Sequence, residues 1–276
     1  MAMPDTASLR MTPSRALRSE LMRLARSPLV GLHLACGIAG GLACGDYFSV
    51  AAWDPAMGAD AFAQLLGALM PLMAGIVCGI AVDAERACGR LANLTAVPSR
   101  ALAVAAKLIA LALAGGIALA LALGVFGTVL AAAGRLALSP LHLASACAGI
   151  LLGSLPVYAL GLALALRFGR NVAIGAGAAG TLLAFFSVGG LAHGLMTGEL
   201  TGANAGPLGL LPCSWPARLG SVAIEAAIAA ERGFAEASAV RAQAAWLGAA
   251  CAILSVVAAA ALIAWFTRFE DRRHDG

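Results

Sequence analysis

Residues 102–132 read LAVAAKLIALALAGGIALALALGVFGTVLAA, and this stretch decides the fold. Its only charged residue is Lys107. About 20 apolar residues are enough for a helix to cross the hydrocarbon core of a bilayer. The stretch therefore predicts a membrane-spanning helix that is either tilted or extends beyond the bilayer.

The composition of the whole chain supports the same conclusion. Of its 276 residues, 61% are hydrophobic and 12% are charged, whereas soluble domains average about 45–50% and about 25%. This leaves too little polar surface for a soluble enzyme, a disordered tail or a nucleic-acid-binding domain, and the net charge of +4 does not change that. We predict an all-α polytopic membrane protein with a single transmembrane domain over residues 1–276.

Five further stretches are long and apolar enough to span a bilayer, which gives six predicted spans. Their approximate ranges are 28–46, 61–82, 102–132, 141–166, 172–192 and 243–266. The last contains Trp246 and Trp265, 19 residues apart. A separation of about 28 Å along a helix suits two anchors at opposite membrane interfaces.

Basic residues are distributed unevenly between the two sides of these spans. If the N-terminus lies inside, 14 of the 18 basic residues fall on the inner side. The four on the outer side are Arg135, Arg218, Arg232 and Arg241. Because basic residues favour the cytoplasmic side, we expect both termini in the cytoplasm and the chain in a bacterial cytoplasmic (inner) membrane.

The segment before the first span predicts a helix lying in the inner membrane interface. Residues 13–27 (PSRALRSELMRLARS) place Leu17, Leu21 and Leu24 on one helical face, with arginines away from it. Such a helix can lie flat with its arginines near lipid phosphates. Ser27 and Pro28 then begin the first span, since proline is tolerated in the opening turn of a helix.

Two other segments outside the spans are informative. Residues 83–100 (DAERACGRLANLTAVPSR) form the longest cytoplasmic polar interruption, and they are either an ordinary loop or a docking surface for a cytoplasmic partner. Residues 193–242 lie outside and are too apolar for an ordinary loop. They predict re-entrant or surface-lying short helices that cap the outer side.

No pattern for catalysis, metal binding or nucleotide binding is found. HExxH, GxSxG and GxxxxGK[ST] are missing, the four histidines are scattered, and the seven cysteines form no CxxC pair. We therefore expect no enzyme activity, catalytic residue or metal ligand in this chain. The predicted spans hold no buried Asp or Glu, and Lys107 is near enough to the inner face to snorkel, which disfavours ion-coupled transport.

Small residues spaced four apart predict close helix packing. The steps are Gly37/Gly41/Gly45, Gly75/Gly79, Gly149/Gly153 and Gly190/Gly194.

Short motifs in three of these segments resemble a known family. Glu20-x-x-Arg23-x-x-Arg26-Ser27-Pro28 resembles the N-terminal signature of type 2 ABC exporter permeases. The run from Asp83 to Arg100 is similar to the segment after their second span. Leu211–Pro216 (LPCSWP), with the length and six-span plan, resembles the permease subunits of lantibiotic immunity transporters. Ala25 departs from the pattern, since a basic residue is common there, and Arg23 replaces a lysine.

The resemblance implies a permease subunit that pairs with itself or with a related subunit on two copies of a cytoplasmic ABC ATPase. ATP and Mg²⁺ would bind to the ATPase, and this chain would carry no cofactor. One implied coupling element is the interfacial helix, with Glu20, Arg23, Arg26, Ser27 and Pro28. The other comprises Asp83, Glu85, Arg86, Gly89, Arg90, Asn93, Leu94, Pro98 and Arg100.

The immunity subgroup implies export of a lantibiotic-like, membrane-active peptide for self-protection, with residues 193–242 capping the path. Membrane lipids, the peptide and the ATPase are the implied partners, and nucleic acid is not among them. The sequence does not identify substrate-binding residues. Two alternatives stay open: a general type 2 exporter of a drug, lipid or glycan, and a non-transporting membrane scaffold or assembly factor.

Overall fold

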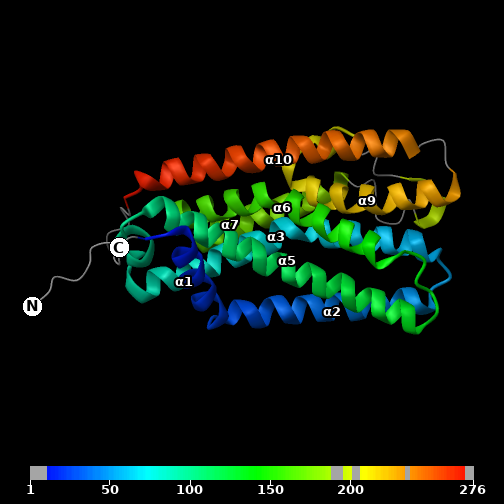
Figure 1. The fold of residues 1–276 in the computed structure, drawn as a ribbon, viewed down its shortest axis with the longest axis horizontal. Helices are drawn as coiled ribbons and strands as arrows, with labels where there is room; N and C mark the ends of the chain where they lie inside the picture. Colours follow the sequence, from blue (N-terminus) through cyan, green and yellow to red (C-terminus); the bar gives the residue numbers. More distant parts are fainter. Residues whose placement is uncertain (1–10, 188–194, 201–205, 234–236, 271–276) are drawn as a thin grey trace, which may run out of the picture.

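In the computed structural model, every regular element is helical within the described residues, which are 11–187, 195–200, 206–233 and 237–270. Five helices in this part of the chain are long and apolar enough to cross a membrane, and the protein is an all-α, multi-span membrane protein. They are α2 (Pro28–Val50), α3 (Pro55–Gly89), α5 (Arg100–Ala132), α6 (Pro140–Phe168) and α10 (Ala237–Thr267). They lie side by side in an elongated bundle (Figure 1).

Each of these helices contains one predicted span in full and extends beyond it. The largest extension is in α3, which begins six residues before the predicted span 61–82 and ends seven residues after it. Asp54 starts this helix early, because its Oδ1 accepts hydrogen bonds from the N–H groups of Ala56 and Met57, both at 3.0 Å. The apolar stretch thus marks where the helix crosses, whereas the cap sets where it begins.

The predicted span 172–192 is only partly described. Its start lies in α7 (Arg170–Ser187), which packs against α3. Residues 188–192 lie outside the described residues. The sixth span therefore stays a prediction.

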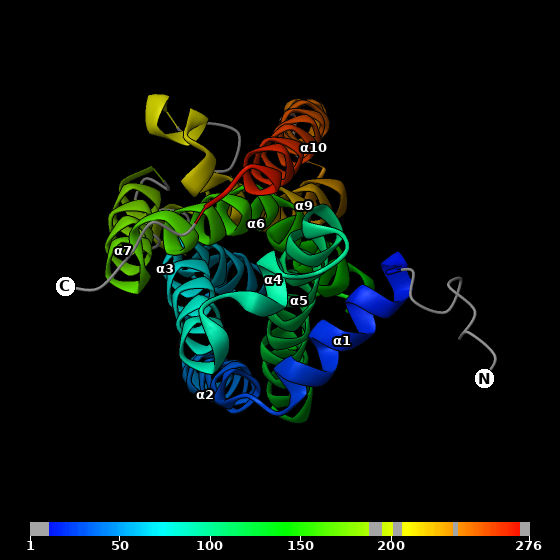
Figure 2. The same cartoon turned by 90° about the vertical axis from the view of Figure 1, so that its left-hand side faces the viewer.

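A shorter helix, α1 (Pro13–Ala25), crosses one end of the bundle, which we call the α1 end (Figure 2). Ser27 separates it from α2: its Oγ donates to the Leu24 carbonyl at 2.8 Å and accepts from the Leu29 N–H at 3.3 Å. Pro28 occupies the first turn of α2. The helix predicted over 13–27 forms over Pro13–Ala25, and the helix that contains the first predicted span begins at Pro28.

Glycines bring the helices into close contact within the chain. A Cβ atom built at Gly41 of α2 would lie 2.6 Å from the Ala122 carbonyl oxygen of α5, and Gly37 faces the same helix. Gly75 packs against α7 in the same way, and Gly153 against the start of α9 (Trp215–Arg232). Three of the four predicted small-residue steps therefore pack helices of one chain. The fourth, Gly190/Gly194, lies outside the described residues.

The segment before α10 reaches into the bundle. A Cβ atom at Gly153, in the middle of α6, would lie 2.6 Å from the Pro216 nitrogen, so α9 begins at mid-length. It ends where Arg232 Nη2 donates to Asp54 Oδ2 at 2.7 Å, at the end of the bundle where α2 joins α3. We call this the Asp54 end. Most of α9 is buried, which favours the re-entrant alternative over a surface-lying helix.

Candidate functional site

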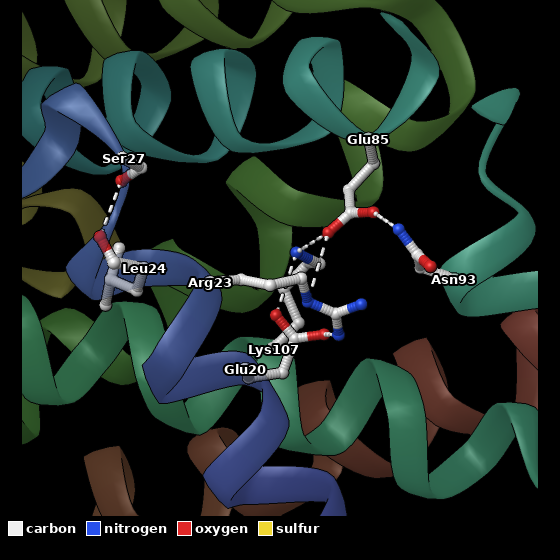
Figure 3. A network of polar contacts seen from close by, with 7 residues as sticks. All are labelled: Glu20, Arg23, Leu24, Ser27, Glu85, Asn93 and Lys107. Atoms are coloured by element: carbon white, nitrogen blue, oxygen red, sulfur yellow. Dashed lines mark hydrogen bonds and ion pairs between the residues drawn. The ribbon is translucent and has the colours of Figure 1, made fainter. Parts of the chain in front are cut away.

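Four charged side chains from three helices meet in the interior at the α1 end (Figure 3). They are Glu20 and Arg23 of α1, Glu85 of α3 and Lys107 of α5. Glu20, Glu85 and Lys107 are only 4%, 6% and 5% exposed. Two carboxylates and two cations balance one another, which is the condition under which charges are tolerated in an apolar interior.

Lys107 is at the centre of this group. Its Nζ donates to Glu85 Oε1 at 2.8 Å and lies 3.0 Å from Glu20 Oε2. Arg23 forms an ion pair with Glu20, and its Nε lies 3.8 Å from Glu85 Oε1. The second oxygen of Glu85 accepts a hydrogen bond from Asn93 Nδ2 at 2.9 Å. We call these five residues the Lys107 network; they join α1, α3, α5 and the short helix α4 (Ala92–Thr95).

The structure corrects the expectation that Lys107 snorkels to the inner face. The side chain is buried because α1 packs across α5 and brings Glu20 directly to it. A nearby counter-charge removes the reason for the ammonium group to reach water. The i, i+3 pair of Glu20 and Arg23 was visible in the sequence, but the pairing of Glu20 with Lys107, 87 residues later, was not.

The local sequence of α1 explains how it reaches the bundle. Its buried residues are Ala16 and Glu20, one turn apart, so a small residue and a carboxylate face the other helices. Leu21 and Met22 are 39% and 50% exposed and point away from that interior. An outward edge with exposed Leu21 and Met22 suits a helix at a membrane surface.

Residues 83–100 are mostly helical. α3 continues to Gly89, and the chain then turns through Arg90 and Leu91, whose φ angles are 49° and 65°. Non-glycine residues rarely adopt this left-handed conformation. The burial of Leu91 and Leu94, both 0% exposed, holds the turn and the short α4 against the bundle. The predicted segment therefore consists of the last turns of α3, a tight turn, α4 and the approach to α5.

The structure separates the predicted coupling residues into groups. The Lys107 network brings together Glu20, Arg23, Glu85 and Asn93. A small cavity of about 110 Å³ lies beside this network, and Ser27 and Pro28 belong to its wall. Three other charged residues of the segment hold other elements together: Asp83 pairs with Arg170 at 3.5 Å, Arg86 donates to the Leu166 carbonyl at 2.6 Å, and Arg100 donates to the Phe269 carbonyl at 3.0 Å. Gly89, Arg90 and Pro98 are exposed beside the turn, and Arg26 is exposed at the end of α1.

A second buried polar cluster lies toward the Asp54 end. It consists of Asp60 and Gln64 on α3, and Ser221 and Glu225 on α9, each at most 3% exposed. Gln64 Nε2 donates to Asp60 Oδ2 at 2.8 Å and to Ser221 Oγ at 3.1 Å. Ser221 Oγ donates to Asp60 Oδ1 at 2.7 Å. The cluster joins α9 to α3.

None of the predicted span ranges contains a buried Asp or Glu among the described residues, but Asp60 and Glu85 are buried in α3 just outside the range 61–82, and Glu225 is buried in α9. Asp60 lies inside the bundle because α3 starts earlier than predicted, and Glu225 does so because α9 packs against α3 and α6. One signal was available. Asp60 and Gln64, and likewise Ser221 and Glu225, are four residues apart, which puts each pair on one helix face.

Among the described residues, no group of three or more His, Cys, Asp and Glu side chains could hold a metal ion. Comparison with protein-family models, with characterised proteins and with solved structures gave no match.

Proposed function

We propose that this chain is the membrane-spanning permease subunit of an ATP-driven ABC transporter, in which a separate cytoplasmic subunit hydrolyses ATP. The observation that carries this proposal is the position of Lys107, buried between Glu20 of α1 and Glu85 of α3. It ties the amphipathic helix and the α3–α4 turn to a long spanning helix. These two elements are the ones that resemble the coupling elements of type 2 exporter permeases.

The network provides a physical route for coupling. Removing one partner from a buried ion pair typically costs about 3–5 kcal/mol, because it leaves an uncompensated charge. α1, α3, α4 and α5 therefore resist separation and move together at this end. A displacement of the α3–α4 turn is transmitted along α3, whose Asp60 and Gln64 bond to Ser221 of α9 near the opposite end.

The surface proposed for ATPase docking is the exposed part of residues 83–100. It consists mainly of small side chains around the turn, namely Ala87, Cys88, Ala92 and Ala96, together with Arg90. Small side chains allow a partner to approach the backbone closely. The buried members of the segment, by contrast, connect this surface to the spanning helices.

The proposed substrate is a lantibiotic-like, membrane-active peptide expelled for self-protection. The resemblance of Leu211–Pro216 to an element of the immunity permeases supports it, and an apolar bundle suits an amphipathic peptide. In the proposed complex two permease subunits, identical or related, sit on two ATPase copies in a bacterial cytoplasmic membrane. Export of a drug, lipid or glycan, and a scaffold role without transport, are the competing functions.

The test is affinity purification of the tagged full-length chain from its native host in a mild detergent. We expect a protein with a GxxxxGK[ST] motif in near-stoichiometric amount and ATPase activity in the eluate, with an unrelated multi-span protein of the same host as control. Without an ATPase in the eluate, the transporter proposal is wrong and the scaffold role gains support. Deletion of the gene then separates the substrates: sensitivity to lanthionine peptides alone supports the immunity role, and sensitivity to unrelated drugs supports general export.

A further inference from the structure

An apolar groove runs between α2 and α3, with α5 as its floor. Its volume is about 310 Å³, within the range of sites that hold small molecules. Apart from His33, the wall consists of apolar side chains, glycines and two cysteines. Gly37 and Gly40 of α2 and Leu69 of α3, itself 39% exposed, belong to this wall. The groove is therefore open to the apolar surface that a bilayer would cover.

His33 is the polar exception in this wall. It is 3% exposed, and its Nδ1 lies 2.6 Å from the Leu29 carbonyl oxygen. A carbonyl only accepts hydrogen bonds, so Nδ1 carries the proton, and in the neutral ring Nε2 is left as an acceptor. Nε2 is buried and has no hydrogen-bond partner among the described residues. A buried acceptor without a donor is costly, and a ligand that brings one removes this cost.

The position of His33 along the groove defines the shape of the ligand. It lies five residues after the start of α2, close to the α1 end, while Cys44 in the same wall lies 11 residues further along. This is about 16 Å along the helix, roughly half of the hydrocarbon thickness of a bilayer. His33 and Cys44 lie five and six residues from the two ends of α2, so a polar group at His33 would lie at one end of the groove, with the apolar remainder of the molecule extending along it. An amphiphile with one polar end and an apolar chain has this arrangement.

We propose that the α2–α3 groove binds a lipid-like amphiphile, with its O–H or N–H group donating to His33 Nε2 and its apolar chain lying along Gly37 and Gly40 toward Cys44. This site belongs to a single chain and does not depend on an ATPase partner. If the groove binds no amphiphile, the proposed permease function is unaffected. If no ATPase partner is found, the proposed lipid site is unaffected.

The chain offers a matched pair of variants for the test. A Cβ atom at Gly40 meets nothing within 4 Å and Gly40 is part of the groove wall, so Gly40→Leu adds a side chain that occupies groove volume. Gly31, on the same helix, is equally open but is not part of the groove wall, so Gly31→Leu is the control. His33→Phe removes the acceptor and keeps an aromatic ring.

The probe is a 16-carbon alcohol with a photoreactive diazirine at mid-chain, added to the full-length protein in phosphatidylcholine nanodiscs. Its methyl ether, which lacks the donor, is the matched probe. We expect saturable labelling of α2 and α3 peptides by the alcohol, with about 3- to 10-fold weaker apparent affinity for the ether. Gly40→Leu should lose saturable labelling, Gly31→Leu should keep it, and His33→Phe should bind the two probes equally.

Three results would overturn the proposal. The first is undiminished saturable labelling in Gly40→Leu. The second is a retained preference for the alcohol in His33→Phe. The third is a lack of saturable labelling in the wild-type protein together with Cys36–Cys36 cross-links between two copies, which would make the groove an interface of the chain with itself.

Discussion

At the scale of single residues, the stability of the α1 end depends on the balance of charge around Lys107. Lys107→Met leaves two buried carboxylates with Arg23 as their only cation in the network, so we expect a loss of about 3–5 kcal/mol in unfolding free energy. The measurement is thermal unfolding in detergent. Adding Glu85→Gln restores the balance and should recover part of the loss. An unchanged melting temperature in the single variant would show that Lys107 is not buried between the two carboxylates.

The polar cluster near the Asp54 end makes a separate prediction at this scale. Ser221 is 0% exposed, donates to Asp60 and accepts from Gln64. Ser221→Ala leaves both partners short of a hydrogen bond, which should cost about 1–3 kcal/mol. Ser145→Ala is the control, since this exposed hydroxyl bonds only to the Leu141 carbonyl of its own helix. Equal melting temperatures for the two variants would contradict the proposed link between α3 and α9.

At the scale of elements, the close packing of α2 on α5 requires a glycine on the face of α2 that contacts α5. A Cβ atom at Gly41 would lie 2.6 Å from the Ala122 carbonyl oxygen, whereas a Cβ atom at neighbouring Gly40 meets nothing. Gly41→Ala should therefore lower the unfolding free energy by about 1–3 kcal/mol. Gly40→Ala should be neutral or stabilising. Thermal unfolding of the two variants side by side measures the difference, and equal values would mean that the helices do not touch there.

The helices themselves were largely predictable from the sequence, and their neighbours were not. The length of the apolar stretches predicted the five long helices, and the Ser27–Pro28 pair predicted the boundary between α1 and α2. Helical spacing could not show that α9 packs inside the bundle, because its neighbours are α3 and α6, far away in the sequence. The Lys107 network was missed for the same reason. Its residues lie at positions 20, 23, 85, 93 and 107, and only the crossing of α1 over α5 brings them together.

At the scale of the whole molecule, the α1 end is expected to face the cytoplasm. Cys88 is exposed there, beside the turn after α3. In a variant that keeps only this cysteine and is expressed without an ATPase partner, a membrane-impermeant maleimide should label inside-out vesicles and leave right-side-out vesicles unlabelled. A single cysteine introduced as Ala132→Cys, exposed near the opposite end, should give the reverse pattern. Labelling of Cys88 only in right-side-out vesicles and of Ala132→Cys only in inside-out vesicles would contradict the predicted orientation.

We propose that an ATPase docks at the α1 end, on the surface formed by residues 83–100. The most direct test of this docking is the amount of ATPase that co-purifies with Ala92→Arg and with Ala132→Arg, two exposed alanines at opposite ends of the bundle. We expect Ala92→Arg to reduce the bound ATPase about 10-fold or more, equivalent to about 1.4 kcal/mol of binding energy or more. Ala132→Arg should retain it, and both variants should reach the membrane in normal amounts. If the two variants retain equal amounts of ATPase, the ATPase does not dock on residues 83–100.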